Sequence, residues 1–143
     1  MDTTTTYTPK KLGPGKLTFT IESAATDFTA KCTSVELAGE APDDSDATFM
    51  LDGSDIFDDT VTFGTIGGTI YQEYVLTALE VWTYQNANKI AKFVFQPAGK
   101  TGYQVAGQCK IKPVKVGGNP KKANTTDFSF PIVGALPTFS QGA

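Results

Sequence analysis

The chain of 143 residues contains no histidine and no arginine, so all twelve of its cations are lysines. Histidine is the usual proton carrier near neutral pH, and arginine offers the planar fork that holds phosphates and carboxylates. A serine or cysteine nucleophile would therefore lack its usual base. A carboxylate pair of the kind that hydrolyses sugars stays formally possible. We expect no enzyme, no catalytic residue and no cofactor.

Cysteine is scarce, and long apolar runs are missing. Cys32 and Cys109 lie 77 positions apart without a CxxC motif, which favours two small buried thiols in a reducing compartment over a disulfide or a metal site. No window approaches the roughly 18 apolar residues of a membrane span. The N-terminus lacks the basic-then-apolar order of a secretory signal. We expect a soluble protein with no membrane partner.

Charges of opposite sign are separated along the sequence. Residues 1–88 carry 14 acids and 4 lysines, whereas residues 89–143 carry 8 lysines and one acid, so the net charge of −3 conceals −10 against +7. If the two halves occupy different faces, one copy presents to the next a surface of opposite sign, which favours head-to-tail association. The alternative is that folding mixes both signs on every face.

Most of the chain alternates apolar and polar side chains, which is the pattern of half-buried β-strands. Strands are predicted at about 17–21, 28–37, 61–63, 69–74, 91–95, 103–111 and 126–133. A change of parity at Thr33 and Ser34 predicts a bulge, and Gly64 and Gly67–Gly68 are interpreted as turns. Only the segment 75–88 has a helical period, with Val75, Leu79 and Trp82 on one stripe.

Seven or eight short strands and one helix predict a mainly β fold, an antiparallel β-sandwich or barrel with one flanking α-helix. The predicted core side chains are aromatic: Trp82, Phe93, Phe95, Phe128 and Phe130. Residues 12–143 are expected to form this single domain, ending in a tail at 134–143 whose Pro137 cannot extend a central strand. The Thr-rich residues 1–11 are expected to be an arm that is flexible or ordered by a partner.

Residues 39–60 form a long acidic segment with seven aspartates, one glutamate and no lysine. The apolar residues 49–51 interrupt it, which predicts a small hairpin inside a long loop, and such loops are usually functional. Its aspartates resemble calcium ligands but do not match the EF-hand order, so no metal site is predicted. Gly99-Lys100-Thr101 lacks the first glycine of a P-loop. The negative balance and the missing arginine disfavour specific DNA binding, whereas an acidic surface lets DNA pass without adhering.

Several short motifs occur in an order and spacing that resemble a known family. They are LGPGKL at 12–17, DFTAKCT at 27–33, IYQEY at 70–74, AKFVF at 91–95, PVKVGG at 113–118 and TDFSFP at 126–131. Together they resemble the major tail proteins, or tail tube proteins, of long-tailed non-contractile phages, particularly those infecting actinobacteria. The likeness spans about residues 12–137. The family often has tryptophan where this chain has Phe130, and an Asp-Trp step near Glu73-Tyr74.

The resemblance implies a β-sandwich whose copies form rings of six, stacked into a tube in the virion tail that delivers the genome. Strands of neighbouring copies would pair around a central barrel. The implied partners are other copies of the chain, the tape measure, tail terminator and distal tail proteins, and double-stranded DNA that passes without specific binding. Assembly would take place in the host cytoplasm. The other possibilities are a carbohydrate-binding or adhesive β-sandwich, or a virion decoration or tail-completion protein.

Within this interpretation, residues 39–60 would stack one ring on the next, with C-terminal lysines as a counterpart. The candidates for contacts between subunits or rings are Asp43, Asp44, Asp46, Asp52, Asp55, Asp58, Asp59, Lys115, Lys121 and Lys122. Alternatively, the aspartates line the lumen and repel DNA. The residues expected to shape the backbone are Gly13, Pro14, Gly15, Gly117, Gly118, Pro131 and Pro137. Gly117–Gly118 would end a strand and turn the chain sharply, and the two prolines would keep the tail from joining the sheet wrongly.

Overall fold

The computed structural model describes residues 12–41, 47–49, 51–52, 55–57, 62–99 and 102–142. The predicted arm at 1–11 lies outside these residues. The described segments form ten strands and one helix. These are β1 (Lys16–Ile21), β2 (Ala24–Asp27), β3 (Cys32–Gly39), β4 (Ala47–Phe49), β5 (Asp55–Phe57), β6 (Gly64–Tyr71), α1 (Leu79–Gln85), β7 (Ile90–Gln96), β8 (Tyr103–Lys110), β9 (Thr125–Pro131) and β10 (Thr138–Gln141).

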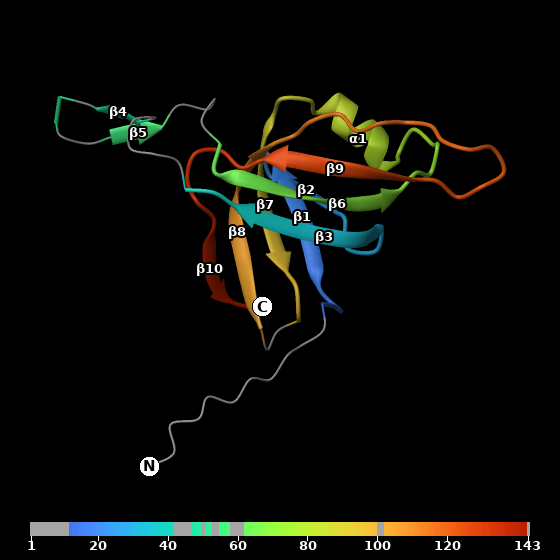
Figure 1. Cartoon of the computed structure of the whole chain (residues 1–143), viewed down its shortest axis with the longest axis horizontal. Helices are drawn as coiled ribbons and strands as arrows, with labels where there is room; N and C mark the ends of the chain where they lie inside the picture. The colour runs from blue at the N-terminus through green and yellow to red at the C-terminus, as the bar shows by residue number, and fades with distance from the viewer. Residues whose placement is uncertain are drawn as a thin grey trace, which may run out of the picture.

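Two antiparallel sheets make up the body of the molecule. The five-stranded sheet has the order β10-β8-β7-β1-β2, the three-stranded sheet has the order β3-β6-β9, and β4 pairs only with β5. In Figure 1 the three-stranded sheet crosses the five-stranded sheet at a steep angle, as in orthogonally packed sandwiches. The predicted mainly β fold, an antiparallel sandwich with one helix, is confirmed.

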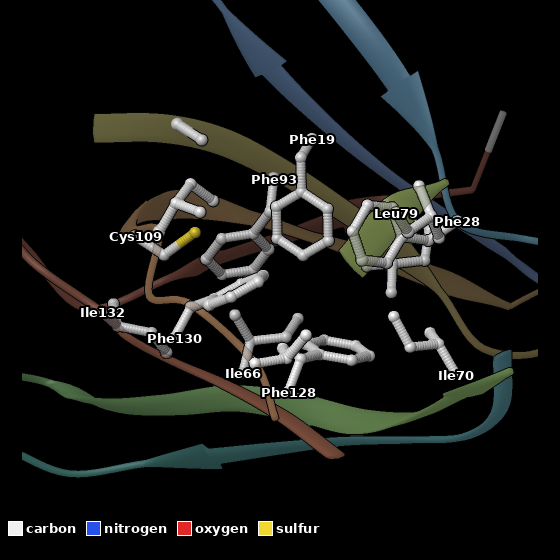
Figure 2. Close-up of a cluster of buried hydrophobic side chains, with 14 of the residues drawn as sticks. Phe19, Phe28, Ile66, Ile70, Leu79, Phe93, Cys109, Phe128, Phe130 and Ile132 are labelled. Atoms are coloured by element: carbon white, nitrogen blue, oxygen red, sulfur yellow. The ribbon is translucent and has the colours of Figure 1, made fainter. Parts of the chain in front are cut away.

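The alternation of the strands places one row of side chains from each sheet between the layers. Phe19 of β1 lies at the centre, with its ring centroid 4.7 to 6.5 Å from the rings of Phe28, Trp82, Phe93, Phe128 and Phe130. Figure 2 shows this cluster between the layers. Of the predicted core residues, Phe93, Phe128 and Phe130 are buried, and Trp82 and Phe95 are partly buried against the cluster.

The glycines interpreted as turns lie inside a continuous strand, so that prediction is wrong. β6 is the central strand of its sheet, begins at Gly64 and runs through Gly67 and Gly68. A Cβ atom on Gly67 would collide with the carbonyl oxygen of Phe128, and one on Gly68 with that of Ser34. The neighbouring strands approach β6 too closely for any side chain there, which is the second common reason for glycine in a strand.

The strand predicted at 28–37 is displaced. β2 ends at Asp27 and β3 begins at Cys32, because Asp27 accepts the backbone N–H of Thr29 at 2.8 Å and turns the chain. The predicted bulge is confirmed, since the register of β3 on β6 shifts between Cys32 and Ser34. The tail forms β10 at the edge of the five-stranded sheet, after Pro137, which agrees with its exclusion from a central position.

Helix α1 is shorter than predicted. It covers Leu79–Gln85, and Val75 lies before it with half of its surface exposed, so its assignment to the buried stripe is wrong. The backbone N–H of Asn86 donates to the carbonyl of Trp82 at 3.0 Å, and the helix ends there, before the end of the predicted segment at residue 88. Trp82 holds α1 against the sandwich, with its ring 5.5 Å from that of Phe28.

Candidate interaction surfaces

The two cysteines are free thiols whose surroundings disfavour the reactive thiolate form. Cys32 is partly buried and Cys109 is buried. Burial raises the pKa of the Cys32 thiol to about 11, with a smaller contribution from the charge of Asp27, and burial alone raises the pKa of Cys109 to about 12. Both therefore stay protonated near neutral pH, and a thiol is a weak nucleophile and a weak metal ligand.

The described residues offer no set of metal ligands. Within them, no three His, Cys, Asp or Glu side chains lie close enough together to hold an ion. Glu80 is the buried carboxylate of the helix, and both of its oxygens are engaged by backbone N–H groups. None of the helices described in this structure is long and apolar enough to span a bilayer.

The acidic segment contains the predicted small hairpin. β4 pairs with β5 in the register Ala47 with Phe57, Thr48 with Ile56 and Phe49 with Asp55. Leu51 and Asp52 lie in the connection between the strands, and Leu51 is fully exposed. Figure 1 shows the hairpin at one end of the longest axis of the molecule. Of the other acidic candidates, Asp55 lies on β5, and those outside the described residues are Asp43, Asp44, Asp46, Asp58 and Asp59.

The long connection between β8 and β9 reaches the opposite end of that axis (Figure 1), and the predicted lysines lie in this connection. Lys115, Lys121 and Lys122 are all exposed. The prediction that Gly117–Gly118 ends a strand is wrong, because β8 already ends at Lys110. The glycines do turn the chain: Gly117 has a φ of +121°, and a Cβ atom on Gly118 would collide with the side chain of Asn124.

Two amides hold this lysine-bearing connection in place. The Gln72 side chain donates through Nε2 to the carbonyls of Gly117 at 2.9 Å and Thr125 at 3.2 Å. Its Oε1 accepts the backbone N–H of Gly117 at 2.8 Å. Asn124 bonds Asn119 in both directions and donates to the carbonyl of Lys122 at 3.1 Å. Hydrogen bonds therefore fix the conformation of the connection between β8 and β9 at its ends and at its tip.

An apolar segment that sequence reasoning missed lies beside the lysines. Tyr74, Val75 and Leu76 precede α1 and are 54%, 50% and 86% exposed. Tyr74 and residues 117–122 line one shallow hollow of about 330 Å³. Together with Val116, which is 56% exposed, these residues give this end of the molecule both apolar and cationic groups. In the sequence, the three consecutive large residues YVL before the helix could have indicated this exposed segment. The helical period led instead to the assignment of Val75 to a buried stripe.

The remaining backbone candidates lie beside β1 and at the end of β9. Gly13 donates its N–H to the carbonyl of Pro97 at 2.6 Å, and a Cβ atom on Gly15 would collide with the carbonyl oxygen of Gln96. Pro14 lies between them and lines a groove of about 340 Å³ between the two sheets. Pro131 ends β9, which is an edge strand and tolerates the missing donor.

Two exposed aromatic rings lie on the β8–β10 edge. The ring centroids of Tyr103 and Phe139 are 5.1 Å apart with planes at 71°, and the residues are 54% and 62% exposed. Rings that meet edge to face present no common flat platform, so they suit an irregular apolar partner better than the face of a sugar ring.

Comparison with known proteins adds no relative: no protein-family model matches the chain, and no curated protein matches it.

Proposed function

We propose that this chain is a structural virion protein whose copies polymerise into stacked rings and form the tail tube of a long-tailed phage. The observation that carries the proposal is the placement of the acidic hairpin and the lysine-bearing connection at opposite ends of the longest axis (Figure 1). Surfaces of opposite sign at opposite ends favour a head-to-tail contact, which builds filaments when it does not close on itself. The motif order from Leu12 to Pro137 is the second support.

The edges of the five-stranded sheet suit lateral growth. β2 and β10 are its edge strands, with four residues each. Four successive antiparallel pairings separate them, so the two strands run in the same direction. Copies related by rotation about an axis along the strands would therefore join edge to edge in parallel. Closure of such a ring leaves none of these edges open, which removes the risk of uncontrolled pairing.

In this proposal the ring of six copies, the passage of double-stranded DNA and the contacts with tape measure, terminator and distal tail proteins follow from the family resemblance. The chain acts mechanically and carries no reaction. Negative-stain microscopy and sedimentation of the purified full chain test the proposal: hollow rods of uniform width are expected. A chain that stays monomeric at high concentration and is missing from purified virions would overturn it.

The second candidate is an adhesive β-sandwich, for which Tyr103 and Phe139 offer exposed aromatic rings, although their edge-to-face arrangement gives a sugar ring no common flat platform. It predicts a monomer that binds glycans and loses binding when Tyr103 is replaced by alanine. A decoration or tail-completion protein would instead appear on virions at capsid sites or in few copies per tail. Binding to a glycan array and the copy number per virion separate both from the tube, which requires many copies per tail and no glycan.

A further inference from the structure

We propose that the free edge of β3 and the groove beside it form a docking site for an extended segment, and that residues 1–11 of the same copy occupy it. The inference concerns the three-stranded sheet. It does not depend on the proposed function, which uses the edges of the five-stranded sheet. The site binds its segment through backbone hydrogen bonds along β3 and through one aromatic side chain in the groove.

β3 is the longest edge strand among the described sheets. It has eight residues and stands first in the order β3-β6-β9. A Cβ atom on Gly68 of β6 would collide with the carbonyl oxygen of Ser34, so this oxygen points toward β6. Because backbone groups alternate in direction along a strand, the N–H and C=O groups of Val35 and Leu37 point to the free edge. An edge of this length pairs with other chains unless a segment covers it.

The groove opens beside the first half of β3, between the two sheets. It measures about 340 Å³, and its walls include Leu17 and Phe95 of the five-stranded sheet and Val35 of β3. Val35 and Phe95 pack against the core but are only partly buried. A side chain in the groove would therefore cover apolar surface that is continuous with the core, which is favourable. A free edge beside an apolar groove suits strand addition, in which backbone bonds give affinity and alternate side chains give selectivity.

The described part of the chain begins at this site. Leu12 lines the groove together with Thr33 of β3, so the eleven residues that precede Leu12 start beside the first residues of β3. Extended, they span at most about 36 Å, whereas six residues of a strand need only about 20 Å. A segment that runs back from Leu12 toward Gly39, the end of β3, lies antiparallel to β3.

The sequence of residues 1–11, MDTTTTYTPKK, has the composition of a strand. Residues 3–8 are threonines apart from Tyr7, and β-branched and aromatic residues favour strands. Tyr7 lies five positions before Leu12, so its ring can reach the groove over about 17 Å or less of extended chain. Pro9 lacks one backbone donor, which an outermost strand tolerates.

The charges and the covalent link favour the segment of the same copy. Lys10 and Lys11 are cations, and Glu36 is the charged residue of β3, so the pair of strands would carry opposite charges side by side. Because the segment is joined directly to its site, its effective concentration there is on the order of millimolar. The segment of another copy would have to compete with this value.

The experiment compares the full chain with two full-length variants. The edge-breaking variant combines Thr4→Pro, Thr6→Pro and Tyr7→Ser, and so removes two backbone donors and the aromatic ring. The matched control combines Thr4→Val, Thr6→Val and Tyr7→Phe at the same positions, and keeps the donors, the β-branching and the ring. Circular dichroism checks that both variants keep the β fold.

Hydrogen exchange by NMR measures the amides of Val35 and Leu37, at a concentration where sedimentation shows the unassembled chain. The amide of Glu36 faces β6 by the same alternation and is the internal reference. In the edge-breaking variant the amides of Val35 and Leu37 should exchange at least about 30-fold faster than in the full chain, whereas Glu36 should change by less than about three-fold. The control should match the full chain. Alkylation of Cys32, which lines the groove, should also become several-fold faster in the edge-breaking variant alone.

Three results would overturn the inference. Equal exchange at Val35 and Leu37 in the full chain and the edge-breaking variant would show that residues 1–11 do not cover β3. Equal acceleration at Glu36 would show that the substitutions loosen the whole sheet and not its edge. Recovery of slow exchange in an isotope-labelled edge-breaking variant after mixing with the unlabelled full chain would show that the segment comes from a second copy. Because the unassembled chain is measured, none of these outcomes depends on whether tubes form.

Discussion

Tyr74 donates its backbone N–H to Oε2 of Glu80 at 3.1 Å while its own backbone lies in the left-handed region, with φ at +56°. This conformation strains any residue other than glycine sterically, so it persists only where the surroundings fix it. The surroundings here are one buried carboxylate that holds two successive N–H groups. These hydrogen bonds therefore fix the backbone between β6 and α1, and with it the side chains of this segment that face outward.

Replacing Glu80 with glutamine should destabilise the fold without changing its topology. The amide keeps one acceptor oxygen, so one of the two N–H groups of Glu73 and Tyr74 loses its partner at a buried site, at a cost of about 1–3 kcal/mol. Urea unfolding measures the change. The control is Glu73→Gln, which removes only a half-exposed ion pair with Lys31 and should cost less than about 1 kcal/mol. Equal losses in the two variants would contradict this role of Glu80.

Alanine at Gly68 should be among the most damaging single-methyl changes in the chain. The added Cβ atom would meet the backbone of β3 at Ser34, which cannot move without breaking the sheet. We expect a loss of about 2–4 kcal/mol, in the range of strained or overpacked core sites. Gly39→Ala is the control, because nothing lies within 4 Å of its added Cβ atom, and it should be neutral or slightly stabilising. Thermal unfolding of both variants decides the matter.

The contrast between Gly68 and Phe19 shows what the sequence can predict. The alternation of apolar and polar residues along β1, β7 and β9 predicts which side chains are buried, because successive side chains of any strand point to opposite faces. The same local reasoning reads GTIGGTI as turns, since glycine signals both a turn and a close approach of backbones. Only the partners of β6, which come from distant parts of the chain, distinguish the two cases. The shape of the lysine-bearing connection could not be predicted for a similar reason, because Gln72 binds Gly117 from 45 positions away in the sequence.

Phe19 should be the most sensitive aromatic position, since its ring meets five others between the sheets. Phe19→Ala should lower the free energy of unfolding by about 3–5 kcal/mol through lost burial and a residual cavity. Phe139→Ala serves as the matched control, because that side chain is 62% exposed and meets Tyr103 at the edge of its sheet. A loss of less than about 1 kcal/mol is expected there. Comparable losses in chemical denaturation would mean that Phe19 is not central to the core.

The cysteines should react slowly and with an unusual pH dependence. Because burial raises the pKa of Cys32 to about 11, its thiolate fraction at pH 8 is roughly 100-fold smaller than that of an ordinary cysteine. Its alkylation rate should keep rising ten-fold per pH unit up to about pH 10. In denaturant the rate should level off near pH 9. Cys109 is fully buried, with a pKa of about 12, and should be modified only after unfolding. Mass spectrometry after iodoacetamide treatment assigns each site, and fast modification of Cys109 in the folded chain would contradict this order.

Reversing Asp43, Asp44 and Asp46 to lysine distinguishes stacking from a lumen role for the acidic segment. If these aspartates face lysines of the next ring, reversal places like charges together and should abolish tube growth. The neutral Asp→Asn triple variant removes the attraction without adding repulsion, so it should only weaken growth and make it less sensitive to salt. If they line the lumen, tubes should form normally and genome passage should slow, because lysines bind the phosphates of passing DNA. Tube length by microscopy and the rate of DNA release from reconstituted virions measure the two effects. The variant Glu22→Lys with Glu36→Lys is the control, since it makes four of the six unit changes in charge at exposed positions on the sandwich itself. Equal loss of growth in this control would show that overall charge, and not the acidic segment, governs assembly.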